Sequence, residues 1–177
     1  METVDEIRVA AVLAPFFRDA AGELRLVLIV RADRGIHGGQ VGFPGGKPEP
    51  GDADLLETAL RESEEEIGLG RDRVAVLEQL PPLLTVLTRY LVHPFVGRIP
   101  AGLDWRLEPG EVVGILTPTV QTLADPAARQ RLRFTSAALP DGMMVDGIAL
   151  DGHVLWGMTL RLLDDMLPRV LAGEWDL

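Results

Sequence analysis

A group of glutamates on one expected helix is the part of this sequence most able to do chemistry. Between residues 55 and 67 apolar side chains recur at helical spacing, and Glu65 and Glu66 follow Glu62 by three and four positions. Like charges at such spacings cost roughly 0.2–0.5 kcal/mol per pair, so a cation is expected beside them. Mg²⁺ prefers oxygen ligands and keeps water and substrate phosphates as its other ligands. The spacing therefore indicates a Mg²⁺ or Mn²⁺ site.

The residues that flank this helix argue against its being only a solvated surface helix. A run of glutamates on a helix is most often only a solvated face. Here a loop rich in glycine and proline, residues 43–52, precedes the helix and can bring its backbone close to a ligand. Gly68 follows where a C-terminal glycine is expected. Arg61 can neutralise only part of the glutamate charge, and we expect it to orient glutamates rather than to contact substrate.

The helix and its loop resemble the signature of the Nudix hydrolases, in which a glycine and a glutamate precede R-E-U-x-E-E-x-G-U, with U a bulky apolar residue. The second half reads RESEEEIGL here, at residues 61–69. Ser63 stands where an aliphatic residue is usual. The early glutamate of the signature falls on Ala53, and Asp52 or Asp54 could replace it. The resemblance implies metal-dependent hydrolysis of a diphosphate bond and an α+β fold, an α/β/α sandwich around a mixed β-sheet.

A second block just upstream is similar to an extra motif of the coenzyme A pyrophosphatase branch of that family. In that motif an arginine and a small residue are followed by G-x-x-x-F-P-G-G, which Arg31-Ala32 and residues 39–46 match. The intervening segment is one residue short, so Arg34 is a stand-in for the arginine expected inside the motif. The resemblance implies cleavage of coenzyme A or its thioesters to adenosine 3′,5′-bisphosphate and (acyl-)4′-phosphopantetheine.

Together these two blocks give the candidate site residues. The predicted metal ligands are Glu62, Glu65 and Glu66, which with Arg61 also form the predicted catalytic group. The resemblance adds a downstream candidate for the general base, Glu111, although a glutamate after Pro-Gly is by itself more often an exposed turn residue. The predicted substrate-binding residues are Arg31, Arg34, Gly45, Gly46 and Lys47. His37, in the glycine-rich loop, could also contact substrate.

The composition fits one enzyme domain spanning residues 1–177, a length usual for a single domain. The net charge of −10, from 17 Lys and Arg against 27 Asp and Glu, argues against nucleic-acid binding, which needs a basic surface. The absence of cysteine excludes disulfides, thiolate nucleophiles and cysteine-ligated zinc. The N-terminus lacks a signal-peptide pattern, and no apolar run approaches the ~20 residues of a membrane span, so we expect a cytoplasmic protein without membrane contact. Homodimerisation is left open.

The elements that must position the site residues are strands and helices in irregular order, which fits an α+β or layered α/β/α domain. The expected strands are residues 8–15, 24–30, 74–84, 91–98 and 112–116. The expected helices are residues 55–67, a weak one at 121–132 and a stronger one at 154–167 that carries Trp156 and is stopped by Pro168. Residues 136–152, with their Asp-Gly pairs, are expected to form turns and could include a hairpin.

Two alternative functions stay open at this level. The substrate could be another nucleoside diphosphate compound, such as ADP-ribose or a nucleotide sugar. The chain could also be a non-catalytic Nudix-like module that binds a nucleotide to regulate a partner. The intact glutamates at positions 62, 65 and 66 favour catalysis, because a binding module does not need a costly cluster of carboxylates.

Overall fold

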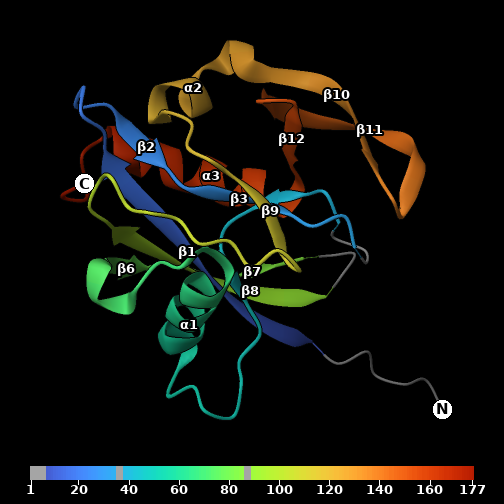
Figure 1. Cartoon of the computed structure of the whole chain (residues 1–177). Helices are drawn as coiled ribbons and strands as arrows, with labels where there is room; N and C mark the ends of the chain where they lie inside the picture. The colour runs from blue at the N-terminus through green and yellow to red at the C-terminus, as the bar shows by residue number, and fades with distance from the viewer. Residues whose placement is uncertain (1–6, 35–37, 86–88) are drawn as a thin grey trace.

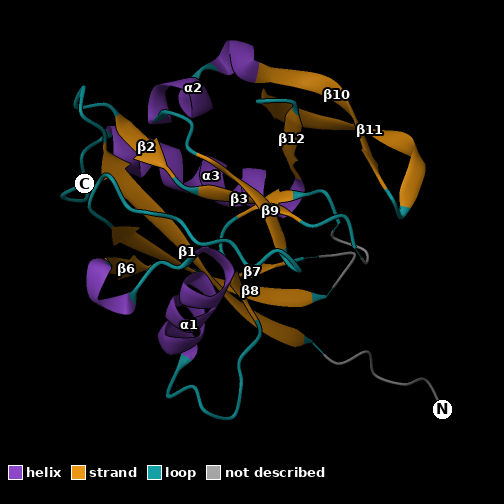
Figure 2. Cartoon of the chain, viewed as in Figure 1, coloured by secondary structure: helices purple, strands orange, loops and turns teal. Residues whose placement is uncertain are grey.

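The computed structural model describes residues 7–34, 38–85 and 89–177, so that His37 lies outside the described residues. Runs of strands are separated by single helices along the chain (Figures 1 and 2). The strands are β1 (Arg8–Arg18), β2 (Leu24–Leu26), β3 (Leu28–Arg31), β4 (Val41–Gly42), β5 (Gly45–Gly46), β6 (Ala75–Gln79), β7 (Leu83–Leu84), β8 (Tyr90–Arg98), β9 (Val112–Leu116), β10 (Arg129–Ser136), β11 (Leu139–Leu150) and β12 (His153–Trp156). The helices are α1 (Leu55–Ile67), α2 (Val120–Ala124) and α3 (Gly157–Leu171), with 3-10 turns η1 (Arg71–Arg73) and η2 (Pro126–Ala128). In this part of the chain no helix combines the length and the apolar character needed to cross a membrane.

The largest sheet is mixed. Its strand order is β2-β1-β8-β6, and the short strands β5 and β7 pair with β1 and β8. β1 and β8 run parallel, from Arg8 opposite Tyr90 to Phe16 opposite Arg98, while the other pairings are antiparallel. Two further sheets of three strands, β4-β3-β9 and β10-β11-β12, complete the β structure of the described residues.

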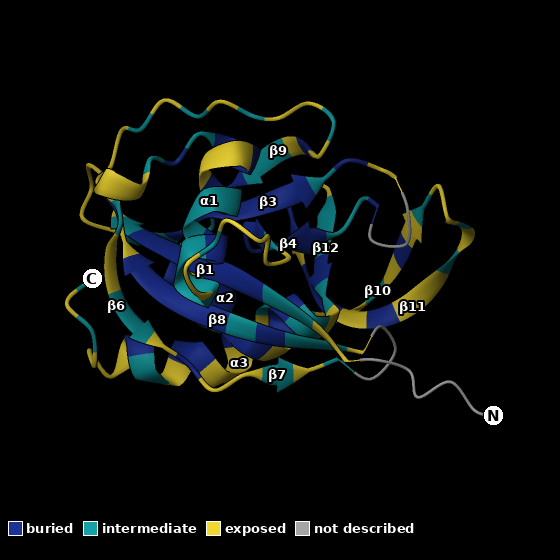
Figure 3. Ribbon diagram, turned by 90° about the horizontal axis from the view of Figure 1, so that it is seen from below, coloured by how far each residue is buried: buried dark blue, intermediate teal, exposed yellow. Residues whose placement is uncertain are grey.

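The two long helices pack on opposite faces of this sheet. Successive side chains of a strand point to opposite faces. Ala11 and Leu13 of β1 accordingly share a hydrophobic cluster with Ile67 of α1, whereas Val12 shares another with Leu163 of α3. β1 and β8 are therefore covered on both sides and are among the most buried strands (Figure 3). The α+β architecture with a mixed sheet between helices is confirmed.

The segment between β9 and α3 differs from the sequence-based expectation. The expected helix at 121–132 is wrong beyond Ala124, because Pro126 begins a 3-10 turn and residues 129–136 pair with β11. Residues 139–150 are likewise not turns but one long strand, whereas the expected hairpin does form, between this strand and β12. Of the Asp-Gly pairs, Asp151-Gly152 does form a tight turn, since both residues have positive φ and join β11 to β12.

The last helix also differs from its expected bounds. Residues 153–156 form β12, so α3 begins at Gly157, and Trp156 is the last strand residue and the N-cap of the helix rather than part of it. Pro168 does not stop α3, which continues to Leu171. A proline near the end of a helix removes one backbone hydrogen bond, and the last turn is still closed by the Ala172 N–H, which donates to the Pro168 carbonyl at 3.0 Å.

Candidate active site

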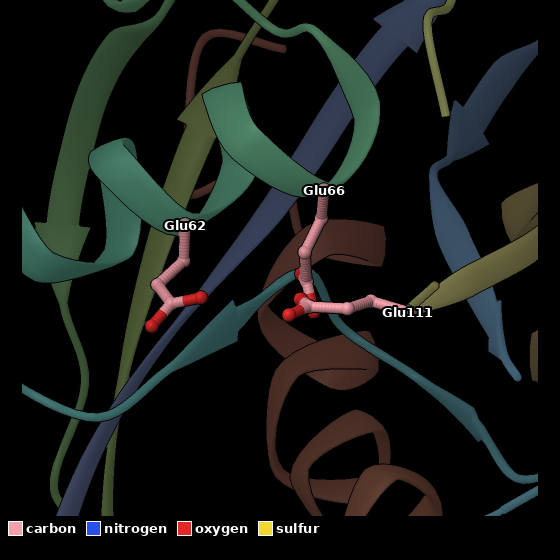
Figure 4. A group of neighbouring side chains, drawn as sticks. All are labelled: Glu62, Glu66 and Glu111. Atoms are coloured by element: carbon pink, nitrogen blue, oxygen red, sulfur yellow. The ribbon is translucent and has the colours of Figure 1, made fainter. Parts of the chain in front are cut away.

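Three carboxylates converge beside α1. One oxygen each from Glu62, Glu66 and Glu111 lies within 4.8 Å of the others. Figure 4 shows Glu62 and Glu66 extending from the same side of α1, while Glu111 reaches toward Glu66 from the segment before β9. Two signature glutamates and the downstream glutamate therefore meet in one place.

Backbone hydrogen bonds bring Glu111 to the helix. The segment that leads to β9 crosses the C-terminal end of α1, where the Arg106 N–H donates to the Ile67 carbonyl at 3.1 Å and the Glu108 N–H to the Glu66 carbonyl at 3.0 Å. The Ala32 N–H then donates to the Glu111 carbonyl at 2.7 Å, which ties the segment to the end of β3. The last carbonyl groups of a helix have no partner within the helix, and these bonds supply one. They hold the segment that carries Glu111 beside the C-terminal end of α1.

Glu66 is the buried member of the cluster, with 1% of its side chain exposed. The Gly45 N–H donates to one carboxylate oxygen at 2.8 Å, and the Arg31 guanidinium donates to the other at 3.1 Å. Burial nevertheless raises the pKa of Glu66 to about 7. Arg31 and the Gly45 N–H oppose this rise, whereas Glu62 and Glu111 add to it. Without a further cation, this carboxylate is held in a place that disfavours its charge.

Glu62 lies against the glycine pair of β5. A Cβ atom on Gly46 would overlap the Glu62 carboxylate, and one on Gly45, whose φ is 145°, would overlap the Ala11 carbonyl. Position 45 therefore requires glycine, whereas a larger residue at position 46 would push the Glu62 carboxylate aside. Burial also raises the pKa of Glu62 above its usual value, with Glu65 and Glu111 adding to the shift and Arg61 opposing it.

Arg61 joins the loop to the helix. Its side chain is 11% exposed, and it donates to both oxygens of Asp52 at 2.9 and 3.1 Å, to Glu65 at 2.9 Å and to the Lys47 carbonyl at 2.9 Å. The pKa of the Asp52 carboxyl is held well below its usual range, chiefly by these bonds from Arg61. Asp52, rather than Asp54, is thus the acidic partner in the loop.

Local caps fix the two ends of α1 and accommodate its unusual serine. Asp54 caps the first turn by accepting from the Glu57 N–H at 2.8 Å. Gly68 adopts the left-handed conformation that ends the helix. Ser63, which replaces an aliphatic residue of the signature, is fully buried and donates its hydroxyl to the Ala59 carbonyl at 2.6 Å. A back-bond of this kind satisfies the hydroxyl without a partner outside the helix.

Glu65 lies outside the cluster. The sequence predicts it as a metal ligand, but its carboxylate is directed to Arg61 and its side chain is 58% exposed. A helix turns by about 100° per residue, so the adjacent Glu65 and Glu66 cannot point the same way. The third carboxylate that lies beside Glu62 and Glu66 is that of Glu111.

The predicted substrate-binding residues fall in different places. Arg31 contacts Glu66 and the Gly45 carbonyl at 3.1 Å, at the border of the cluster. Lys47 is exposed, with its ammonium 5.9 Å from the ring centroid of Tyr90. Arg34 is exposed and is neither part of the carboxylate cluster nor among the residues that border the neighbouring cavity.

A cavity of about 630 Å³ adjoins the cluster, and most of the predicted substrate-binding residues line it. Arg31 and Gly45 border both the cavity and Glu66. The opposite walls come from β7, β8, β12 and the start of α3, which are far apart along the chain. Trp156, which the sequence analysis expects on the last helix, is a β12 residue that lines this cavity.

Comparison with known proteins agrees with this geometry. The model of the NUDIX domain matches residues 7–137. A protein described as an uncharacterised Nudix hydrolase, NudL, from Photorhabdus laumondii is 32% identical over 166 residues, 94% of this chain and 87% of that protein. NudL of Yersinia pestis is 44% identical over 109 residues, which are 61% of this chain and only 53% of the relative.

Solved structures share the fold at low sequence identity. An Ap4A hydrolase from C. elegans superposes with a TM-score of 0.64 at 16% identity, covering 94% of this chain and 99% of the other. The NUDIX domain of NrtR from Shewanella oneidensis, solved with ADP ribose, gives 0.59 at 14% identity, covering 94% and 90%. A NUDIX hydrolase from Alicyclobacillus acidocaldarius gives 0.66 at 18% identity, covering 94% and 93%. With the family model spanning most of its length, this chain belongs to the Nudix family.

Proposed function

We propose that this protein hydrolyses the diphosphate bond of coenzyme A or its thioesters, with Mg²⁺ or Mn²⁺ as cofactor, to adenosine 3′,5′-bisphosphate and (acyl-)4′-phosphopantetheine. The convergence of Glu62, Glu66 and Glu111 carries the hydrolytic part of this proposal. The coenzyme A part is supported by the upstream block, Arg31-Ala32 followed by residues 39–46, which resembles the motif of that branch.

The carboxylate cluster fits a divalent cation. Its donors are hard oxygen ligands of the kind that Mg²⁺ and Mn²⁺ prefer. Glu66 is almost fully buried beside two other carboxylates, and burial raises its pKa despite the contact with Arg31. Glu62, Glu66 and Glu111 would hold the ion, and Glu65 stays a predicted ligand that must first leave Arg61. A bound divalent ion polarises phosphoryl oxygens and lowers the pKa of bound water.

The side chains around the cluster have separate tasks. Glu111 is the exposed member and would accept a proton from the attacking water, whereas Glu66 is held by two hydrogen bonds and is better suited to a fixed ligand. Arg61 and Asp52 keep the glycine loop against α1. Arg31 and Lys47 bring positive charge to a substrate that the net charge of −10 would otherwise repel.

Hydrolysis in heavy-oxygen water tests both halves of the proposal. With coenzyme A and Mg²⁺, mass spectrometry should show the two expected products and ¹⁸O in one of them, which identifies the attacked phosphorus. Rapid cleavage of ADP-ribose with coenzyme A untouched would contradict the substrate assignment but not the chemistry. No cleavage of any diphosphate by the folded, metal-loaded protein would instead favour the non-catalytic module. That residues 1–177 form one domain, that the protein is cytoplasmic and that it can form a homodimer stay predictions.

A further inference from the structure

The cavity beside Glu66 is lined by positive charge, although the chain as a whole is acidic. Its lining includes the cations Arg31, Lys47 and Arg161, and no aspartate or glutamate is among the described residues that line it. The chain as a whole carries 27 acidic against 17 basic residues. A volume of about 630 Å³ lies within the usual range of small-molecule sites, roughly 300–1,000 Å³. The cavity therefore suits an anionic ligand of nucleotide size.

The three cations are not equally available to a ligand. Arg31 already donates to Glu66 and to the Gly45 carbonyl. Arg161, an exposed residue in the second turn of α3, forms no ion pair or hydrogen bond with any other described residue. A guanidinium with its planar set of donors free is well suited to bind a phosphate group through two hydrogen bonds.

Most of the remaining lining is apolar or aromatic, with Gln40, Thr85 and Thr159 as polar members. Leu83, Val92, Tyr90 and Trp156 contribute to the walls, and the Trp156 ring is held by Phe134 at a centroid distance of 4.9 Å. Aromatic side chains offer a surface on which any nucleobase can stack. The same cavity thus combines walls suited to a base with a free cation suited to a phosphate.

We propose that this cavity holds the nucleotide arm of the substrate, and that Arg161, assisted by Lys47, binds a phosphate monoester which that arm carries in addition to the diphosphate. The inference rests on the proposed function, because Arg31 places the cavity next to the carboxylates where the diphosphate would be cleaved. Arg161 is then a specificity-determining residue that favours substrates with a 3′-phosphate over those without one.

Binding of two nucleotides that contain no diphosphate tests Arg161 without requiring catalysis. In calorimetric titrations we expect the parent to bind adenosine 3′,5′-bisphosphate about tenfold or more tightly than AMP, as one charge-assisted hydrogen-bond pair supplies. Arg161→Gln should remove this preference while leaving AMP binding unchanged. Arg73→Gln is the matched control, since Arg73 is an equally charged, exposed residue outside this cavity. Equal binding of the two nucleotides by the parent, or a preference that survives Arg161→Gln, would overturn the assignment.

Hydrolysis then separates this inference from the function on which it rests. The parent should cleave coenzyme A with a higher kcat/KM than 3′-dephospho-coenzyme A, and Arg161→Gln should lower only the former. Equal cleavage of both substrates by the parent would refute the role of Arg161 and leave the hydrolase proposal standing. Selective binding of the bisphosphate without hydrolysis of any diphosphate would refute the hydrolase proposal and leave the cavity assignment standing. Circular dichroism of both variants establishes that each is folded.

Discussion

Replacing Glu66 by glutamine should change stability in opposite directions at low and at high pH. Burial raises the pKa of Glu66 from its ordinary 4.5 to about 7 in the folded, metal-free protein. A carboxyl whose folded pKa is raised contributes full stability below about pH 4.5 and loses that contribution as the pH rises through about 7. The rise from 4.5 to about 7 corresponds to ~3 kcal/mol at 1.36 kcal/mol per pKa unit.

Glutamine removes the charge but keeps only one of the two hydrogen bonds. Its carbonyl can still accept from the Gly45 N–H, whereas its amide faces the Arg31 guanidinium donor to donor. The lost bond costs roughly 1–2 kcal/mol at every pH. Near pH 8 the net change for Glu66→Gln is therefore a gain of about 1–2 kcal/mol, or a few degrees in Tm for a chain of this size. Near pH 5 the same variant should be slightly less stable than the parent.

The assay is thermal unfolding by circular dichroism, in EDTA near pH 5 and pH 8 and again with Mg²⁺ or Mn²⁺. A ligand that binds only the folded state raises Tm, so the parent should gain stability with metal near pH 8 and Glu66→Gln should gain much less. Turnover of the variant should fall by orders of magnitude. The reasoning is refuted if the variant and the parent differ by the same amount at both pH values, or if both respond equally to metal.

Three further substitutions test the rest of the site. Glu65→Gln should lower activity less than Glu66→Gln, because Glu65 is exposed and lies outside the carboxylate cluster; steady-state kinetics with equal losses in the two variants would contradict this. Gly46→Ala should weaken Mn²⁺ binding, as measured by titration, because the added Cβ would displace the Glu62 carboxylate; unchanged affinity would mean that the loop can yield. Asp52→Asn should lower Tm at neutral pH and reduce the fall of Tm on acidification. The depressed pKa of Asp52 means that its contribution to stability is present above its unfolded pKa and is lost in acid. Identical pH profiles of Tm for variant and parent would exclude this role.

The sequence by itself determined the bounds of α1 and the pairing of two of its glutamates. The predicted bounds, residues 55–67, are those observed, because the apolar spacing and Gly68 act between residues close in the chain. The pairing of Glu62 with Glu66 on one side of the helix follows from the same local geometry. The strand at 112–116 was also predicted with its observed bounds, since it is a short run rich in β-branched residues.

Tertiary structure alone decided which residues meet. Glu111 enters the cluster, and Arg161 and Trp156 line one cavity, only because β9, α3 and β12 pack beside segments distant from them in the chain. Asp52 rather than Asp54 pairs with Arg61 because of the path of the loop, which no spacing encodes. Residues 129–150 form paired strands instead of the expected helix and turns, because strand pairing supplies backbone partners that local propensity does not anticipate. Contacts between neighbours in the chain are set by spacing, whereas contacts between distant segments depend on which surfaces the folded chain buries together.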